Sequence, residues 1–290
     1  MKSRLSFLAL ICCLSASAAF AQPAPKPQSR FAQLEGMRVH YQNYGRGSEA
    51  LIFIHGWTCN ANFWKANVPA FIGATRVIAV DLPGHGESDK PQTATYSMDL
   101  FARAVDAVLQ NAKVEHAVLI GHSMGAPVLR QFYRKFPTKV RALVIVDGSL
   151  KVMGTREQMN PFLEPLRKPD YLKSAEQSVT YLTNGMKNEA VRAEVKTAML
   201  SAPQHVMVSA FEEMLNPEVW REPVKFTVPV LALMALNPQW DKAYEAFVRE
   251  TAPGVEYQVW PGVSHFLMMD EPEKFNGTVM TFLKRNKLIK

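Results

Sequence analysis

The sequence contains little cysteine, and most of it lies near the amino terminus. Cys12 and Cys13 fall within the first 21 residues, and Cys59 is the only cysteine after them. A single thiol cannot form an internal disulfide, so the stability of the folded chain must come from its core. We interpret Cys59 as a small buried hydrophobic residue and not as a reactive thiol.

The sequence also lacks an apolar run long enough to cross a membrane. Its longest candidate, LSFLALICCL, falls short of the roughly 20 apolar residues that a spanning helix needs. Basic residues precede this run, and the small residues Ala19 and Ala21 stand before Gln22, which is typical of a secretory signal peptide. We therefore predict a signal peptide over residues 1–21 with cleavage near Ala21, a secreted or periplasmic protein, and no stable membrane span.

Clusters of basic residues are equally scarce. The formal net charge is +7, and it falls to +5 once Lys2 and Arg4 leave with the signal peptide. There is no zinc-ligand spacing and no basic stripe with interleaved aromatic residues, which excludes the common nucleic-acid modules. The densest basic stretch, KRNKLIK at the carboxyl terminus, is interpreted as a solvated helix end. We expect a small-molecule substrate and no nucleic-acid partner, and the oligomeric state stays open.

What the sequence does have is a series of short apolar runs that alternate with helical patterns. All but the first of these runs are continuous and apolar or β-branched, which is typical of strands buried on both faces, whereas residues 38–44 alternate as an edge strand does. The predicted strands cover residues 38–44 (an edge strand), 50–55, 76–81, 116–121, 142–147, 228–235 and 255–260, and the predicted helices cover 97–112, 124–137 and 271–286. This alternation predicts an α/β fold with a parallel sheet and helices on both faces.

Two segments depart from the alternation. The stretch QPAPKPQ opens a proline-rich linker, assigned to residues 22–30, and one domain then covers residues 31–290. Within that domain, residues 150–226 show the pattern of several helices rich in Met, Phe and Leu, with no strand. Because helices inserted between two strands lie over the strand ends, we predict a helical lid there.

The stretch VLIGHSMGAP places Ser123 between two glycines, after a buried strand and before a helix. It fits the pattern G-x-S-x-G, in which a sharp turn forces the serine into an unfavourable backbone conformation that only nearby glycines allow. The hydroxyl then projects above the sheet, and the backbone N–H of Met124 points to the same place from a helix N-terminus. We therefore predict that Ser123 is a nucleophile.

A serine nucleophile needs a base, and in an open α/β sheet the base comes from the carboxyl end of another strand. His265 follows the last predicted strand and precedes the final helix, so we predict that His265 is the base. The other histidines are His55, His85 and His122, in glycine turns near the same edge, and His40, His116 and His205, which resemble ordinary strand or helix residues.

The turn after the strand at 50–55 offers a second backbone donor. Its residues Gly56 and Trp57 stand where a loop can face the serine, so we predict an oxyanion hole made by the N–H groups of Trp57 and Met124. The alternative is a plain turn, in which Trp57 is a core aromatic residue and His55 organises the loop through hydrogen bonds.

Four motifs, FIHGW, DLPGHGESD, GHSMG and GVSHF, occur in this order, each at the end of a predicted strand. Through them the chain resembles the α/β-hydrolase fold superfamily over about residues 31–288. The resemblance implies an eight-stranded, mostly parallel, doubly wound sheet, a helical lid after the sixth strand, and catalytic Ser, Asp or Glu, and His in chain order. In the second motif, we expect Asp81 and Ser88 to satisfy backbone groups near the serine.

The acidic partner of the histidine has two candidates. In most members of the superfamily it follows the strand before the last, but residues 236–239 are Leu, Asn, Pro and Gln, and Asp241 comes late and can cap a helix. A minority of members place the acid after the sixth strand, where Asp147 stands. A carboxylate there can orient an imidazole, or it can cap the turn at Gly148. We favour Asp147 and keep Asp241 as the alternative.

The predicted reaction is acyl transfer to water by Ser123, His265 and Asp147, and it implies no metal or organic cofactor. A serine at the turn argues against haloalkane dehalogenase and epoxide hydrolase activity, because those enzymes use a carboxylate there. The alternatives are C–C bond hydrolysis, lactone opening or perhydrolysis in the same site, and a non-catalytic binder of a small hydrophobic molecule.

The apolar residues of the predicted lid indicate the substrate. They favour a carboxylesterase-like enzyme that acts on esters with a small to medium apolar acyl or alcohol part. The lid residues that we expect to contact such a substrate are Met153, Met159, Phe162 and Met214.

Overall fold

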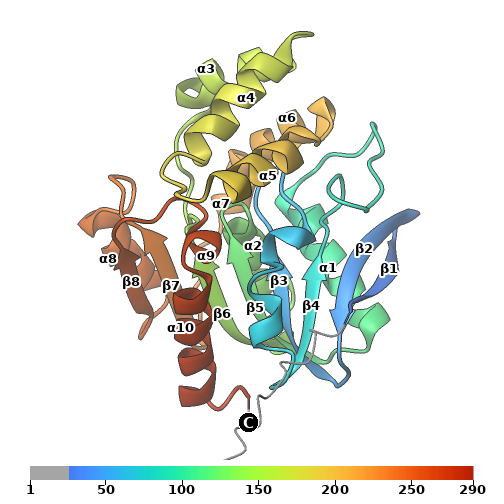
Figure 1. The fold of residues 1–290 in the computed structure, drawn as a ribbon, viewed down its shortest axis with the longest axis vertical. Helices are drawn as coiled ribbons and strands as arrows, with labels where there is room; N and C mark the ends of the chain where they lie inside the picture. The colour runs from blue at the N-terminus through green and yellow to red at the C-terminus, as the bar shows by residue number, and fades with distance from the viewer. Residues whose placement is uncertain (1–25, 290) are drawn as a thin grey trace, which may run out of the picture.

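Eight strands form one sheet at the centre of the computed structural model, which describes residues 26–289 (Figure 1). The strands lie in the order β1-β2-β4-β3-β5-β6-β7-β8. Strands β1 and β2 are antiparallel to their neighbours, and all other pairs are parallel. Their bounds are β1 Gln28–Leu34, β2 Met37–Tyr44, β3 Glu49–Ile54, β4 Arg76–Val80, β5 His116–His122, β6 Val140–Val146, β7 Val230–Ala235 and β8 Glu256–Trp260. The predicted α/β fold with a mostly parallel eight-stranded sheet is confirmed.

The amino-terminal edge of the sheet differs from the prediction. Strand β1 begins at Gln28, inside the linker predicted over 22–30, and it takes the edge position that was predicted for residues 38–44. Because Ala32 is its only buried residue, β1 has no apolar run to reveal it. A two-residue turn at Glu35 and Gly36, both with positive φ, joins β1 to β2. The predicted signal peptide and the start of the linker lie outside the described residues.

Helices cover both faces of the sheet. Helices α1 (Met98–Ala112) and α2 (Gly125–Lys135) pack against each other behind the sheet, and α10 (Pro272–Arg285) lies in front of it (Figure 1). Ser97 caps α1 by accepting a hydrogen bond from the N–H of Leu100, as its sequence pattern predicts. Two further helices, α8 (Lys242–Thr251) and α9 (Leu267–Asp270), flank β8 in the chain.

Five helices lie between β6 and β7, where the sequence predicts the lid. They are α3 (Arg156–Arg167), α4 (Tyr171–Leu182), α5 (Glu189–Leu200), α6 (Gln204–Met214) and α7 (Pro217–Trp220). Figure 1 shows α3 to α6 stacked above the end of the sheet, and we call residues 150–226 the lid. The cavity described below is therefore enclosed between the lid and the carboxyl ends of the strands.

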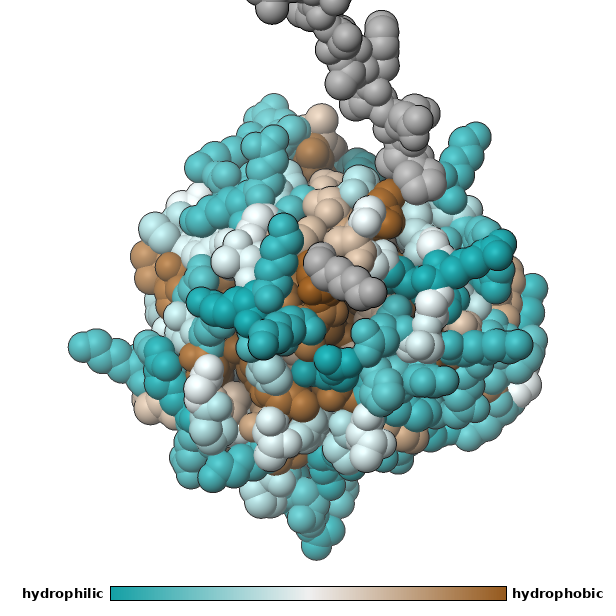
Figure 2. Space-filling view, turned by 90° about the horizontal axis from the view of Figure 1, so that it is seen from below, coloured by the Kyte–Doolittle hydropathy of each residue, from teal (hydrophilic) through white to brown (hydrophobic). Residues whose placement is uncertain are grey.

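The end of the molecule opposite the lid differs in the hydropathy of its surface. Seen from below, it shows mostly hydrophilic side chains at its periphery around a smaller apolar area (Figure 2). Among the helices of residues 26–289, none is both long enough and apolar enough to cross a membrane.

Candidate active site

Ser123 occupies a tight turn between β5 and α2. Its φ is 53°, in the left-handed region that residues with a Cβ rarely adopt. Three glycines let other backbone approach this turn closely. A Cβ on Gly121 would lie 2.8 Å from the carbonyl carbon of Gly125, one on Gly125 2.8 Å from Ile54 O, and one on Gly148 2.5 Å from Ser123 O. The glycines of GHSMG and the one after β6 are thus required by sterics.

Asp147 and His265 are joined by a hydrogen bond in which His265 Nδ1 donates to Asp147 Oδ2 at 2.7 Å. Asp147 follows β6, is 2% exposed and has a φ of 44°. The other candidate acid, Asp241, caps α8 by accepting a hydrogen bond from Tyr244 N at 2.7 Å. The structure therefore brings Asp147 to His265 and gives Asp241 a helix-capping contact.

Ser123, His265 and Asp147 line the same cavity. About one fifth of the His265 side chain is exposed. Ser123 Oγ makes no hydrogen bond to any of residues 26–289, so the hydroxyl can rotate toward His265 or toward a bound molecule. Contacts between a nucleophile and its base are often long until substrate binds.

The second carboxylate oxygen of Asp147 also has partners. Asp147 Oδ1 accepts a hydrogen bond from the backbone N–H of Ala235 and another from Trp240 Nε1, each at 2.7 Å. Trp240 lies in the loop between β7 and α8 and also lines the cavity. The sequence does not predict the contact of Trp240, because the reach of its indole depends on β6 and β7 being neighbours in the sheet.

Tyr244, on α8, joins the segment that follows Asp147 to the body of the fold. Its hydroxyl donates to Gly148 O and accepts from Leu150 N, both at 3.1 Å. Burial raises the pKa of Tyr244 to about 12, so the hydroxyl stays protonated and can make both bonds. The first residues of the lid are thus attached to α8.

The loop after β3 approaches the serine as predicted. A Cβ on Gly56 would lie 3.0 Å from Ser123 Cβ, and Trp57 and Met124 both line the cavity. Neither the Trp57 N–H nor the Met124 N–H donates to another group among the described residues, so both are available to a ligand. The Trp57 ring is held by a hydrogen bond from Nε1 to Met207 O in the lid, at 2.9 Å.

Two buried histidines hold this loop. His55 Nδ1 donates to Gly56 O at 2.8 Å, and His55 Nε2 accepts from Leu82 N at 3.0 Å. His85 Nε2 accepts from Thr58 N at 3.3 Å. Burial lowers the pKa of His55 and lowers that of His85 to about 3, which keeps both rings neutral. Because both nitrogens of His55 are engaged, it organises the loop and is not placed to be a base.

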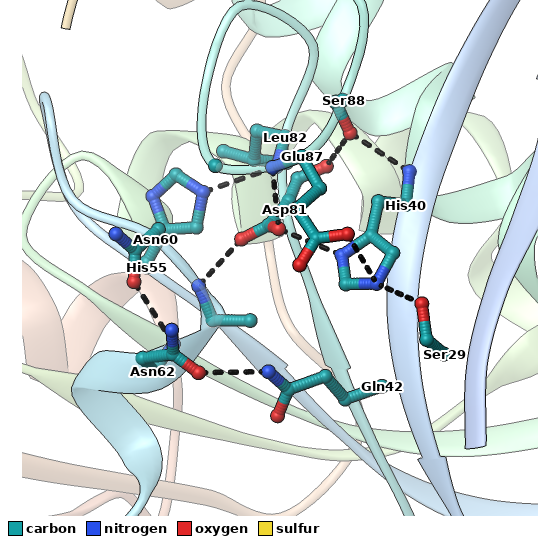
Figure 3. A network of polar contacts seen from close by, with 12 residues as sticks. Ser29, His40, Gln42, His55, Asn60, Asn62, Asp81, Leu82, Glu87 and Ser88 are labelled. Carbon is teal, nitrogen blue, oxygen red and sulfur yellow. Dashed lines mark hydrogen bonds and ion pairs between the residues drawn. The ribbon is translucent and has the colours of Figure 1, made fainter. Parts of the chain in front are cut away.

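Asp81 is the centre of a polar network that includes the segment following the same loop (Figure 3). Its Oδ1 accepts from Ala61 N at 2.6 Å, and its Oδ2 accepts from His40 Nδ1 at 2.7 Å and from Glu87 N at 2.9 Å. Burial raises the pKa of Asp81, but these hydrogen bonds, led by that from His40, hold it below its usual value. Ser88 Oγ donates to Asp81 O at 2.6 Å. As predicted, Asp81 and Ser88 satisfy backbone groups.

His122 holds the backbone of His265. Its Nε2 donates to His265 O at 2.9 Å, and the two ring centroids are 4.7 Å apart. Burial, and then the proximity of His265, lower the pKa of His122 well below its usual value. His122 Nδ1 has no hydrogen-bond partner among the described residues. Sequence reasoning missed this contact because His122 occupies a variable position of G-x-S-x-G.

The cavity has a volume of about 620 Å³ and mostly apolar walls. All four lid residues named from the sequence contribute to it, together with other apolar residues: Met153, Met159, Phe162, Met214, Trp57, Phe211, Leu215 and Trp220. Tyr181 and Leu236 line it and are 77% and 64% exposed, so they mark its mouth. Such a cavity can hold an apolar molecule with its reacting group at Ser123.

Cys59 is buried, and burial raises the pKa of its thiol, in agreement with its interpretation as a small hydrophobic residue. Within residues 26–289, no group of three or more His, Cys, Asp or Glu side chains is arranged to hold a metal ion.

Comparison with known proteins gives a consistent family. Residues 51–278 match the sequence model of a family described as the alpha/beta hydrolase family. A 2-hydroxy-6-oxononadienedioate/2-hydroxy-6-oxononatrienedioate hydrolase from Burkholderia vietnamiensis is 27% identical over 269 residues, which cover 86% of this chain and 92% of the relative. A solved esterase from Exiguobacterium antarcticum is 20% identical, has a TM-score of 0.80 and covers 89% of this chain and 100% of its own, which shows a shared fold.

A third match is partial. The dihydrolipoyllysine-residue acetyltransferase component of an acetoin cleaving system from Cupriavidus necator is 35% identical over 118 residues. This alignment covers 41% of the chain and spans about a third (31%) of the relative's length.

Proposed function

Because this chain belongs to the alpha/beta hydrolase family, we propose that it is a serine hydrolase that cleaves small to medium apolar carboxylic esters. The observation that carries the proposal is the hydrogen bond between His265 and Asp147 beside the strained Ser123, at the floor of an apolar cavity. A nucleophile, a base and a group that orients the base are the parts that acyl transfer needs.

In the proposed mechanism, Ser123 Oγ attacks the ester carbonyl and its proton passes to His265 Nε2. Asp147 holds Nδ1 and stabilises the imidazolium that forms. His265 then gives its proton to the departing alcohol, which leaves an acyl-enzyme on Ser123. Water, activated by the same imidazole, attacks the acyl carbonyl, and the acid is released as Ser123 recovers its proton.

The charge that develops on the carbonyl oxygen needs donors. We assign this role to the backbone N–H groups of Trp57 and Met124, which flank Ser123 and have no other acceptor among the described residues. Losing one such donor costs about 2.7–4 kcal/mol of transition-state stabilisation in related chemistry. Both are backbone groups, so the geometry of the two loops, and not a side chain, supplies this stabilisation.

A series of p-nitrophenyl esters, from acetate to dodecanoate, tests the proposal. We expect hydrolysis that Ser123→Ala abolishes, and labelling of Ser123 by a fluorophosphonate probe. A purified, folded protein that hydrolyses none of these esters is not an esterase. If Ser123 also stays unlabelled, the remaining interpretation is a non-catalytic binder on the same fold.

C–C bond hydrolysis in the same site is the second candidate. The relative from Burkholderia vietnamiensis, named as a hydrolase of 2-hydroxy-6-oxononadienedioate, aligns along almost its whole length with this chain. Parallel assays with that compound and with the esters separate the two. A higher kcat/KM for the dienedioate would replace the ester assignment and leave Ser123 as the labelled residue. Lactones and perhydrolysis belong in the same panel.

We also propose that the protein is exported by the signal peptide predicted at residues 1–21. Expression of the full chain in a bacterium, followed by fractionation, should place it in the periplasm or medium, and mass spectrometry should find a mature chain that starts near Gln22. A cytoplasmic protein that retains residues 1–21 would refute export.

A further inference from the structure

We propose that Trp240 is a positioning residue of this site, whose indole N–H fixes the Asp147 carboxylate in the orientation that receives His265. The inference rests on the proposed function, because it gives Trp240 a role in the same reaction. Nothing in the sequence motifs points to this residue. The structure does, because Trp240 and His265 are the two side chains that hydrogen-bond to Asp147 among the described residues.

The carboxylate of Asp147 is shielded from solvent and needs hydrogen-bond donors from the protein. Asp147 is 2% exposed, so bulk water has little access to its oxygens. Oδ2 receives His265, and Oδ1 receives two donors at 2.7 Å, Ala235 N and Trp240 Nε1. A buried carboxylate must be paired and hydrogen-bonded to stay charged. Trp240 therefore supplies one of two hydrogen bonds that fix the oxygen facing away from the histidine.

The Trp240 indole is itself held in place. In the loop that carries Trp240, Asn237 Oδ1 accepts from Gln239 N at 2.8 Å, and Asn237 O accepts from Trp240 N at 3.2 Å. The next residue, Asp241, caps α8. The Trp240 ring packs on Tyr244 with centroids 4.7 Å apart. The N–H is thus aimed at Asp147 before any substrate binds.

In the reaction, the hydrogen bond from the indole N–H matters most when positive charge develops on His265. As His265 becomes an imidazolium, Asp147 must remain aligned with Nδ1. Without the Trp240 donor, Ala235 N alone holds Oδ1, and the carboxylate can rotate away from the histidine. Because a Phe ring would still fill the cavity wall, substrate binding should change little. The loss should appear in kcat and not in KM.

The test is Trp240→Phe, with Trp260→Phe as the matched control. Trp260 Nε1 donates to Gln258 Oε1 at 3.0 Å, outside the cavity, so Trp260→Phe also removes one indole hydrogen bond. For Trp240→Phe we expect kcat on a p-nitrophenyl ester to fall about tenfold, equivalent to about 1.4 kcal/mol, with KM within twofold. For Trp260→Phe we expect kcat to stay within twofold of the wild type.

A double-mutant cycle separates positioning from a general loss of structure. In an Asp147→Ala background, Trp240→Phe should lower kcat no further, because the bond that it removes is already gone. If Trp240→Phe folds poorly, β-(3-benzothienyl)alanine at position 240 removes the N–H and keeps the bicyclic shape, and the same tenfold loss is expected.

Two outcomes overturn the inference. If kcat is unchanged in Trp240→Phe or in the benzothienyl variant while the wild type is active, Trp240 is not a positioning residue. The proposed function then stands and only this inference fails. The same tenfold loss with and without Asp147 also refutes it, because the effect would not pass through the carboxylate. A wild type that hydrolyses no substrate and resists the fluorophosphonate instead refutes the proposed function, and this inference with it.

Discussion

At the scale of the single residue, two aspartates of this protein make different kinds of contact. Asp147 ends a buried strand and faces an imidazole, whereas Asp241 faces the amino end of a helix and accepts a backbone N–H. Both positions are plausible for a catalytic acid in the sequence. In the structure, Asp241 is engaged as the cap of α8, and Asp147 is the carboxylate that reaches His265.

Asparagine substitutions at the two positions test this difference. Asp147→Asn should lower kcat by roughly 10³–10⁴-fold, because an amide can hold the wrong tautomer of the histidine. Asp241→Asn should leave kcat unchanged within twofold, since Asn caps helices about as well as Asp. Steady-state kinetics on one p-nitrophenyl ester measures both. A large loss in Asp241→Asn with normal activity in Asp147→Asn would reverse the assignment of the acid.

At the scale of the element, the sequence predicts most of the fold and less of the site's support. The sequence predicts seven of the eight strands, six from apolar or β-branched runs and β2 from its alternating pattern. Strand β1 is not predicted, because the side chains of an edge strand mostly face solvent. The turn at Glu35 and Gly36 was the available signal. Ser123 and His265 come from motifs, and their catalytic roles stay predictions.

Contacts that depend on neighbouring elements could not be predicted from the sequence. His122 and Trp240 act through hydrogen bonds to groups 143 and 93 residues away in the chain. Neither residue type carries a pattern for such a contact. Both contacts depend on the order β5-β6-β7-β8 in the sheet, which brings the loops after these strands to one edge.

Helix α4 of the lid offers a test of substrate size. Tyr181 and Leu172 both lie on α4 and are both exposed, but Tyr181 lines the cavity and Leu172 does not. Tyr181→Ser should lower kcat/KM for dodecanoate about fivefold, from about 1 kcal/mol of lost apolar contact, and leave acetate unaffected. Leu172→Ser should change neither. Equal effects on both chain lengths would show that Tyr181 acts on the fold and not on the substrate.

At the scale of the whole molecule, the fold depends on histidines that remain uncharged. His55, His85 and His122 are all buried among the strand ends, and burial lowers the pKa of each. The unfolded chain binds protons at these residues near pH 6.5, whereas the folded chain does not. Protonation therefore favours the unfolded state as the pH falls below about 6.5. Asp81, whose pKa is also lowered, shifts stability in the same direction.

Urea unfolding at several pH values measures this effect. Stability should be full above about pH 6.5 and should decrease as the pH falls toward the folded pKa, about 3 for His85. Each fully neutral histidine contributes up to about 1.4 kcal/mol per pH unit. His85→Gln should reduce the slope, whereas His116→Gln, at an exposed position, should not. Equal stability at pH 5 and pH 7.5 would show that these rings can charge without unfolding.

The hydrogen bonds of Tyr244 to Gly148 and Leu150 connect the start of the lid to α8. The lid begins at residue 150, shortly after Asp147, so a displacement of the lid helices would act on the segment that carries the carboxylate. Tyr244 ties Gly148 and Leu150 to α8, and these two hydrogen bonds would resist such a displacement. The position of the Asp147 carboxylate therefore depends on the attachment of its neighbours to α8 as well as on β6.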